Sequence, residues 1–574
     1  MSAHNNSTDS THIPRRPPEQ VMRLDRMGSA HQGRLSFMRT LLRRLKRESW
    51  SFERTVWDID AQGVGRAVYQ AKGPDRTYSL IAFAHDLPDE LRSDRVIAEA
   101  WDATFTLFDG VPEVADLDRL QDNVPKQEAG RVTAKELTLS RANRSVRLFT
   151  AVVDALAQGR QPQMAQLEQV GYLMRTTAVY GSGKFGAADR DLIWQRSELA
   201  GPFQAEMLSV WLIRAFTLDL VEHMAAVKGG EQAVPLAPEL RRCIGVGNST
   251  GLGMAPFLMN HPMLLNNWMM AREEAIARVR SIEQVAPEDF ELFRKFLARA
   301  WINTQQWQSQ HPIQQPKIVS CKGDIRRLQT YLIMFKPDKP YAWDRLYQWA
   351  EGRLSAEGQE LLTMLMLEPY AEMVDGLTDC MNADEQYLPL IDAGMTVAEM
   401  RRWLEQYYSW ALEMDFSSEA SRSRFWYVSE EKLEPRLGER FDEPGGELEQ
   451  PLCIGWHVNQ LGVALAEWGN PDDGLAVFLR QHPEFRHVVR RTQYADKFPY
   501  MEIQDNLIAS EMLPIDLLRL KLSFFGATKF DPRSDRWVRI TMFQHAPFPH
   551  ELAEMSADDW VYPPLWDTAE EKMA

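Results

Sequence analysis

Two glycine-rich stretches carry the residues whose types and spacing can support chemistry. In the first, residues 245–253, four of nine residues are glycine. Glycine permits positive φ and a close approach of backbone to ligand, and a capped helix after such a loop offers free N–H groups to an anion. We expect a carboxylate or phosphate to bind here, through Gly247, Asn248, Ser249, Thr250 and Gly251. The alternative is a tight turn before a capped helix.

The second stretch, residues 180–189, has the spacing G-x-G-x-x-G in its glycines Gly181, Gly183 and Gly186. A dinucleotide-binding loop has this spacing, but it also needs a buried strand before the loop and a βαβ unit around it. Residues 163–177 read instead as a helix. The P-loop pattern fails because Phe185 stands where a serine or threonine would bind magnesium. NAD(P) binding is therefore an alternative, and no cofactor is required by the sequence.

Lys184 is the main catalytic candidate of the second stretch. A lysine on a glycine-rich loop can neutralise an anionic substrate, or act as a base or Schiff-base former if burial lowers its pKa. Tyr180 and His261 are the acid/base candidates. Further substrate-binding candidates are Ser182, Gly183 and Arg175. We predict that both stretches converge on one cleft, whereas a solvated surface lysine is the alternative for Lys184.

Other chemistries have weaker patterns. Residues 247–251 match the serine-hydrolase motif G-x-S-x-G around Ser249, but no clear buried strand precedes the serine. The chain has no HExxH or His-x-His, so no protein-held metal is expected. Three acidic residues share one helical face, which we interpret as a solvated surface: Glu368, Glu372 and Asp375.

Composition limits the class of protein. The chain has 574 residues, 65 basic and 81 acidic, for a net charge of −16, so binding to nucleic acid is not expected. Its four cysteines are far apart, which favours a reducing compartment. It has neither a long apolar run nor a signal-peptide pattern, so we predict a cytoplasmic protein without a transmembrane segment. A homo-oligomer is among the partner states that the sequence leaves open.

The elements that must position these residues are mainly helical. We predict a mainly α, overall α+β fold: a large helical body, a small N-terminal antiparallel β region and an α+β C-terminal part. The expected divisions are a disordered tail (1–33), a basic helix plus β-meander (34–130), a helical core with both glycine-rich loops (131–414) and an α+β region (415–574). Helices are expected at 144–157, 163–177, 202–227, 256–285, 288–308, 343–375 and 396–414, and short strands at 317–320, 424–429 and 537–544.

The basic helix, residues 34–47, combines an apolar stripe with five surrounding basic residues. Such a helix can bind an acidic partner or a membrane surface. We favour the other interpretation, in which it lies on acidic residues of its own protein. The 18 tryptophans are interpreted mainly as helix-packing residues.

These patterns predict a soluble enzyme that acts on a small anionic metabolite without a metal. The reaction stays open among lyase, transferase and hydrolase. A nucleotide-dependent oxidoreductase is the first alternative. A non-enzymatic helical scaffold or regulatory protein is the second.

Overall fold

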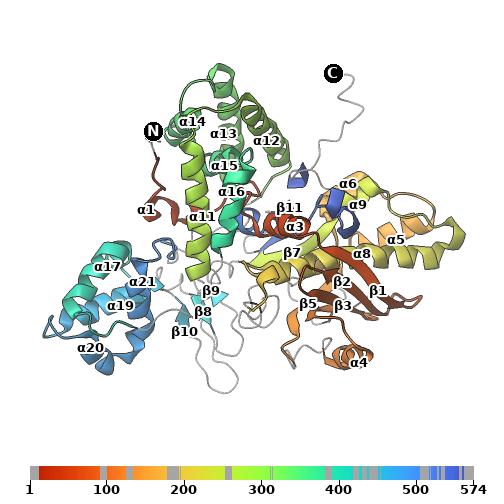
Figure 1. Ribbon diagram of the computed structural model, residues 1–574, viewed down its shortest axis with the longest axis horizontal. Helices are drawn as coiled ribbons and strands as arrows, with labels where there is room; N and C mark the ends of the chain where they lie inside the picture. The colour runs from red at the N-terminus through yellow and green to blue at the C-terminus, as the bar shows by residue number, and fades with distance from the viewer. Residues whose placement is uncertain are drawn as a thin grey trace, which may run out of the picture.

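The computed structural model of the chain is a mainly helical α+β fold built on one large sheet (Figure 1). It describes residues 12–88, 100–123, 133–176, 195–251, 262–310, 314–381, 391–417, 454–504, 519–526 and 537–554, with shorter pieces at 90, 193, 312, 426–428, 436–437, 450–452, 516, 529–531 and 559–561. Among the helices in these ranges, none combines the length and hydrophobicity that a bilayer crossing needs.

The predicted antiparallel meander is confirmed. Alternating side chains and turn residues form successive hairpins here, as the two-residue period requires. Gly63 takes a φ of +78° in the first turn. The strands of the predicted meander are β1 (Ser51–Ile59), β2 (Gly65–Lys72) and β3 (Thr77–Ala84). β4 (Ala103–Asp109) and β5 (Glu136–Arg144) continue it antiparallel, and β5 lies in the part of the chain that was expected to be helical.

Four further strands extend the meander into a nine-stranded sheet of order β1-β2-β3-β4-β5-β6-β7-β12-β11. β6 runs antiparallel to β5 but parallel to β7, and β12 and β11 continue antiparallel. The β region is therefore larger than expected, because strands from the middle and end of the chain join it. The added strands are β6 (Tyr172–Thr176), β7 (Gly245–Gly251), β11 (Lys529–Asp531) and β12 (Trp537–Met542).

Several local predictions are wrong. The helix expected over 163–177 is α6 (Met164–Val170), which ends at Gly171 with a φ of +81° and is followed by β6. The loop expected at 245–253 is strand β7 as far as Gly251, because β6 and β12 supply its backbone hydrogen bonds. The strand expected at 317–320 belongs to helix α13 (Gln314–Met334).

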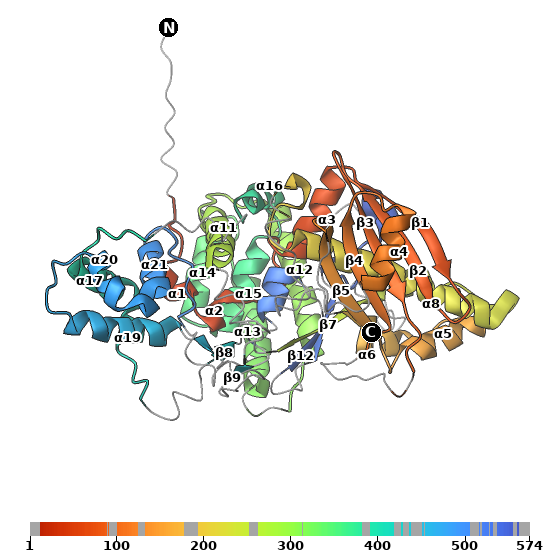
Figure 2. The ribbon, with the colours of Figure 1, turned by 90° about the horizontal axis from the view of Figure 1, so that it is seen from below.

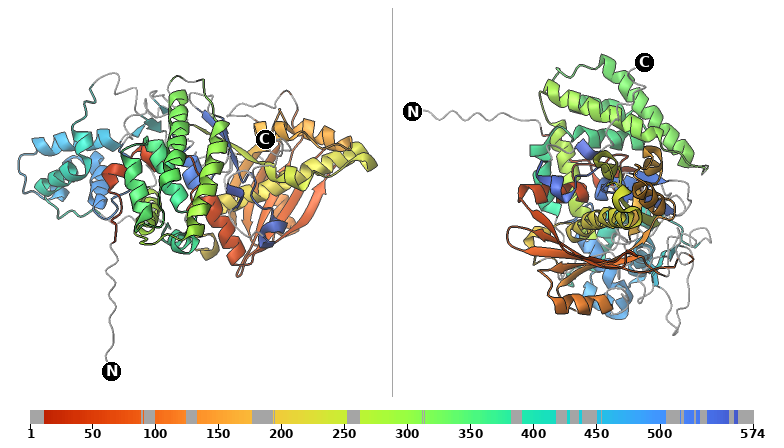
Figure 3. Two further views of the ribbon diagram at one scale, coloured as in Figure 1. Left: turned by 90° about the horizontal axis from the view of Figure 1, so that it is seen from above. Right: turned by 90° about the vertical axis from the view of Figure 1, so that its right-hand side faces the viewer.

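Helices cover both faces of the sheet. The long α8 (Gln204–Gly229) and α5 (Phe149–Ala157) pack together on one face, and α4 (Val114–Asn123) lies on the other (Figure 3). α8 is buried along most of its length, and its Trp211 indole donates a hydrogen bond to the Pro547 carbonyl (2.9 Å). The helix thus connects the meander to the C-terminal part of the chain.

A second group of helices packs beside the sheet. It consists of α11 (Pro262–Arg280), α12 (Pro287–Gln305), α13, α14 (Ala342–Glu351), α15 (Ala356–Met366) and α16 (Ala371–Val374). The helix expected over 343–375 is therefore three helices. Ser355 caps α15 by accepting a hydrogen bond from the Gly358 amide, which separates α14 from α15.

The prediction of a disordered tail is wrong for the residues that the structure describes, from residue 12 onward. It contains α1 (Pro18–Val21) and α2 (Leu24–Met27), and its apolar side chains are buried. Arg16 is also buried and bonded to Glu273 and Glu360. Few apolar residues suffice here, because they fill space between helices that come from elsewhere in the chain.

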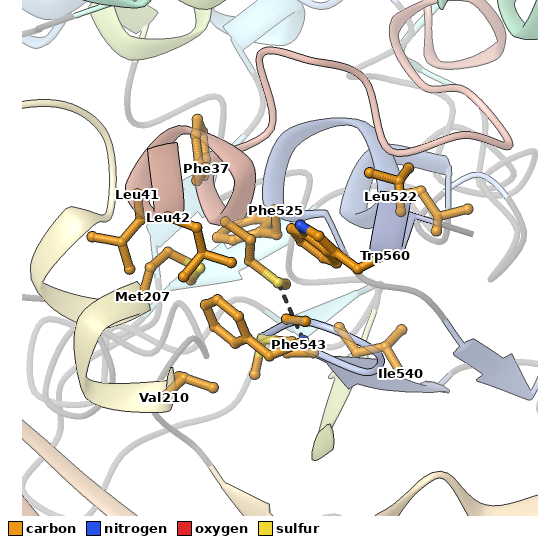
Figure 4. Close-up of a cluster of buried hydrophobic side chains, with 14 of the residues drawn as sticks. Phe37, Leu41, Leu42, Met207, Val210, Leu522, Phe525, Ile540, Phe543 and Trp560 are labelled. Carbon is orange, nitrogen blue, oxygen red and sulfur yellow. Dashed lines mark hydrogen bonds between the residues drawn. The ribbon is translucent and has the colours of Figure 1, made fainter. Parts of the chain in front are cut away.

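The basic helix is α3 (Phe37–Arg47), and it lies in the centre of the molecule. In Figure 4 its Phe37, Leu41 and Leu42 face side chains from α8 and from the C-terminal region. The Phe543 amide, just after β12, donates to the sulfur of Met38 (3.4 Å). These contacts give α3 a structural role in the core.

A separate apolar cluster holds a helical lobe of α17 (Val397–Leu412), α19 (Ile454–Glu467), α20 (Leu475–Gln481) and α21 (Arg486–Ala495). Figures 1 and 2 show this lobe and the large sheet at opposite ends of the molecule, with α11–α16 between them. The lobe joins residues on both sides of the division expected at 414. Between α17 and α19 in the sequence, a small three-stranded sheet forms from β8 (Trp426–Val428), β9 (Arg436–Leu437) and β10 (Gln450–Leu452).

Candidate functional site

β6, which precedes the second predicted stretch in the sequence, pairs in parallel with β7, which contains most of the first. Tyr172 pairs with Gly245 and Arg175 with Gly247, so the carboxyl ends of both strands point the same way. Residues 177–192 and 252–261 continue from these two ends. The candidates in those segments lie outside the described residues: Tyr180, Ser182, Gly183, Lys184 and His261.

The glycines of β7 are required by packing. A Cβ at Gly247 would lie 2.6 Å from Cγ of Tyr172, and one at Gly245 would lie 2.3 Å from the carbonyl oxygen of Met542. Neither position has room for a side chain. The space above Gly247 is therefore filled by the Tyr172 ring, and the glycine does not need a ligand to explain it.

Ser249, Thr250 and Gly251 lie inside the same strand, and their backbones pair with β12. A nucleophile elbow places its serine on a sharp turn between a strand and a helix. Ser249 has strand neighbours on both sides. The serine-hydrolase pattern at 247–251 is therefore coincidental.

The Asn248 side chain of β7 forms a hydrogen bond to the backbone of β6. Its side chain is 1% exposed, and its Nδ2 donates to the Thr176 carbonyl (2.9 Å) at the end of β6. Its Oδ1 is buried and has no hydrogen-bond partner among the described residues. Asn248 pairs with Ile540, whose side chain lies in the core, so this free acceptor points to the core face.

Arginines gather on the opposite face of this corner. One row of cross-strand partners runs over four strands: Asn143, Arg175, Gly247 and Thr541. Partners in register share a face, and so do residues two apart on a strand. Arg141 on β5 and Arg539 on β12 therefore lie on the same face as Arg175. We call Arg141, Arg175 and Arg539 the arginine face.

The arginine face lies at the carboxyl ends of the parallel pair. Ala142 of β5 pairs with Thr176, the last residue of β6, and the two strands are antiparallel. Arg141 therefore lies one residue beyond the carboxyl end of β6. Adjacent strands are about 4.8 Å apart, so the three arginine positions span about 14 Å, within reach of converging guanidinium groups. Arg141 lies over the Trp101 ring (4.0 Å), and Arg175 is 8% exposed. Such a group can bind a carboxylate or phosphate.

The sequence predicted Arg175 but missed Arg141 and Arg539. Arg141 and Arg539 come from segments about 400 residues apart in the sequence. Only knowledge of the strand pairing could have grouped them. The arginine face and Asn248 occupy opposite sides of β6–β7, so the structure does not bring Arg175 and Asn248 side chains together.

Buried ion pairs hold α3, and they correct the interpretation of the acidic helical face. Glu368 is 3% exposed and accepts hydrogen bonds from His31 (2.6 Å) and from both terminal nitrogens of Arg39 (2.6 and 2.8 Å). Asp375 accepts from Arg34 (2.8 and 2.7 Å). Glu372 alone of the three predicted surface residues is exposed. The interpretation that α3 lies on its own acidic residues is confirmed.

The electrostatics of this cluster indicate a structural role. Burial raises the pKa of the Glu368 carboxyl, but the charge and hydrogen bonds of Arg39 outweigh it and hold that pKa well below its usual range. Burial lowers the pKa of His31. The carboxylate of Glu368 is thus paired with His31 and Arg39 inside the core.

Two other kinds of site are unsupported in the described part of the chain. Within those ranges, no three His, Cys, Asp or Glu side chains are grouped to hold a metal ion. A cavity of about 170 Å³ between the sheet and α8 is lined in part by Asp219. The carboxylate of Asp219 accepts hydrogen bonds from the Tyr69 hydroxyl (2.7 Å) and from the Arg54 guanidinium (2.9 Å). This cavity is smaller than typical ligand pockets of about 300–1,000 Å³.

Comparison with protein-family models, with curated proteins and with solved structures gave no match for this chain. The fold and site define a mainly helical α+β protein with a mixed sheet and a basic corner. Its function is inferred from its own residues.

Proposed function

We propose that this protein is an enzyme that binds a small carboxylate or phosphate metabolite at the carboxyl ends of β6 and β7. The observation that supports this most directly is the strand register, which groups Arg141, Arg175 and Arg539 on one face. Three arginines thus lie in one corner of a chain whose net charge is −16. Guanidinium groups bind carboxylates and phosphates through paired, charge-assisted hydrogen bonds.

The topology also favours a site at this corner. Ligands of open sheets with parallel strands commonly bind beyond the carboxyl ends of those strands, where the strand order changes. Here the sheet changes from the antiparallel meander to the parallel pair and then to the β12–β11 hairpin. Lys184, with His261 or Tyr180 as acid/base group, would act on the bound anion. The reaction class stays open among lyase, transferase and hydrolase.

A thermal-shift screen with inorganic phosphate, pyrophosphate, succinate and citrate tests the proposal. A ligand at 100 times its Kd adds about 2.7 kcal/mol to the stability of the folded state. We expect Arg141→Ala/Arg539→Ala to weaken binding of the active anion at least tenfold, because each charge-assisted hydrogen bond is worth about 1.5–3 kcal/mol.

The matched control is Arg401→Ala/Arg402→Ala, which removes the same charge from the exposed surface of α17. It should bind the anion like the wild type. Wild-type affinity in the Arg141/Arg539 variant would refute the arginine face as the site. If none of the anions shifts the unfolding temperature of the wild type, the non-enzymatic scaffold is favoured.

Once an anion is identified, its turnover can be followed by NMR of the ligand. Lys184→Ala should abolish turnover while the circular dichroism spectrum and unfolding midpoint stay unchanged. Unchanged turnover would remove Lys184 from the mechanism without affecting the binding proposal.

A nucleotide-dependent oxidoreductase is the second candidate, and one observation favours it. β6 is buried along its length, precedes the glycines at 181–186, and is connected to the parallel β7 through α8. In a dinucleotide-binding loop the glycines open the following helix, and the residues where such a helix would begin, 177–192, lie outside the described part of the chain. Titration with NADH, followed by its fluorescence, separates the two: saturable binding would favour the oxidoreductase.

A further inference from the structure

A second basic site lies far from the β6–β7 corner, among the helices beside the sheet. It is a cleft of about 570 Å³, open to solvent, between α13, α14 and the residues just after α14. We call it the arginine–tryptophan cleft. Its lining residues are Arg326, Arg327, Thr330, Tyr331, Trp349 and Arg353.

Two aromatic rings form the wall of this cleft. Tyr331 of α13 and Trp349 of α14 stack with ring centroids 3.9 Å apart and an interplanar angle of 6°. Both side chains are half-buried, so the helices fix their positions while part of each ring faces the cleft. Such a rigid aromatic surface can pack against a planar ring of a ligand. Stacking of a nucleobase on an aromatic side chain strengthens binding by roughly tenfold.

The arginines of the cleft differ in how far their charge is neutralised. Arg327 forms an ion pair with the buried Asp324 (2.9 Å). Arg326 lies over the Trp301 ring (4.6 Å), and Arg353 donates to the Trp349 carbonyl (3.4 Å). Among the described residues, neither Arg326 nor Arg353 has a carboxylate partner, and both side chains are exposed. Two positive charges are therefore available beside the aromatic wall.

The size and charge of the cleft select the ligand. Its volume lies in the range of sites for small molecules, about 300–1,000 Å³. A planar wall with two guanidinium groups suits a ring that carries phosphate, because guanidinium pairs with phosphate oxygens and the ring stacks. The net charge of −16 disfavours a long nucleic-acid strand.

We propose that the arginine–tryptophan cleft binds a nucleoside phosphate. Because Tyr331 and Trp349 cover each other's inner faces, the base packs on one outer face of the pair, and the phosphates bind Arg326 and Arg353. This site is independent of the anion site at β6–β7, and it can serve as a regulatory or co-substrate site. Its recognition requires both a ring and a negative charge.

Isothermal titration with ADP, adenosine and inorganic pyrophosphate tests this requirement. The full-length wild type should bind ADP at least tenfold more tightly than either adenosine, which lacks the charge, or pyrophosphate, which lacks the ring. Arg326→Ala/Arg353→Ala should weaken ADP binding at least tenfold. Because both arginines are exposed, the fold should survive, as an unchanged unfolding midpoint would show.

Two control variants localise the binding. Arg401→Ala/Arg402→Ala carries the same change of charge on α17, and Arg141→Ala/Arg539→Ala alters only the β6–β7 corner. Both should retain wild-type affinity for ADP at the cleft. Loss of ADP binding in the Arg141/Arg539 variant, with retention in the Arg326/Arg353 variant, would overturn the proposal and assign the nucleotide to the corner.

Three other results would also overturn it. The first is no ADP binding by the wild type at millimolar concentration. The second is pyrophosphate binding as tight as ADP binding, which would show that the ring is not recognised. The third is displacement of ADP by an eight-residue oligothymidylate at lower concentration than by ATP, which would indicate a strand-binding surface.

Discussion

Replacing Glu368 by glutamine tests whether buried charge holds α3 in the centre of the molecule. The substitution keeps the size of the side chain and removes its negative charge. Arg39, which is fully buried, would then face a neutral amide in place of a carboxylate that accepts two of its hydrogen bonds. His31 would lose the same partner. An uncompensated guanidinium in the core is the expected result.

The expected loss is about 3–5 kcal/mol, which is the usual cost of removing one partner of a buried ion pair. This is a large share of a typical stability of about 5–15 kcal/mol. With a urea m-value of about 3 kcal/mol per molar, the midpoint of unfolding should fall by roughly 1 M or more. Removing the buried charge as well, with Arg39→Met in the same chain, should recover part of the loss.

The matched control is Glu372→Gln, four residues further on. Glu372 is exposed, so its variant should stay within about 0.5 kcal/mol of the wild type. Urea unfolding followed by circular dichroism and tryptophan fluorescence measures both variants. If Glu368→Gln loses no more stability than Glu372→Gln, the buried ion pairs do not stabilise the core.

The pH dependence of the same pair gives a second check. The pKa of Glu368 in the folded protein lies well below that of a glutamate in an unfolded chain, about 4.3. The unfolded chain therefore takes up the proton first. The stabilisation by Glu368 is complete above about pH 5 and is lost as the pH falls below 4. The stability difference between wild type and Glu368→Gln should shrink over that acidic range.

Two other predictions concern single positions. Gly247→Ala should lose about 1–3 kcal/mol of stability, because its Cβ would meet the Tyr172 ring at 2.6 Å. The control is Gly323→Ala on α13, where no described atom lies within 4 Å of the added Cβ, and it should gain up to about 1 kcal/mol. Equal effects of the two variants in urea unfolding would contradict the packing described for Gly247. Burial lowers the pKa of Lys521 to about 7. The stability of the wild type should therefore rise with pH between about 7 and 10. Lys521→Met should remove this rise and should be more stable than the wild type by a few kcal/mol at pH 7. A wild-type pH slope retained in that variant would contradict the assignment.

Local patterns predicted the elements whose contacts are close in sequence. The meander of β1–β3 follows from alternating side chains and from the turns around Gly63 and Gly73. Helices such as α8 and α12 follow from apolar residues at helical spacing, and α17 begins with a capping box at Thr396 and Glu399. In each case the deciding interactions lie within a few residues.

The strands β6 and β7 could not be predicted in this way. The β6 segment is short and follows a helix directly, and three of the seven residues of β7 are glycines, which are disfavoured in strands. β7 is a strand because β6 and the distant β12 flank it and satisfy its backbone groups. The parallel pairing of β6 with β7 is thus a tertiary property.

The sequence by itself determined the composition, the net charge, most helices and the meander. The tertiary structure alone decided which charged residues are buried and which arginines share a face. Glu368 and Glu372 have the same side chain, four residues apart, yet only Glu368 meets Arg39 in the core. Burial and cross-strand register depend on segments hundreds of residues away, and a local pattern contains no information about them.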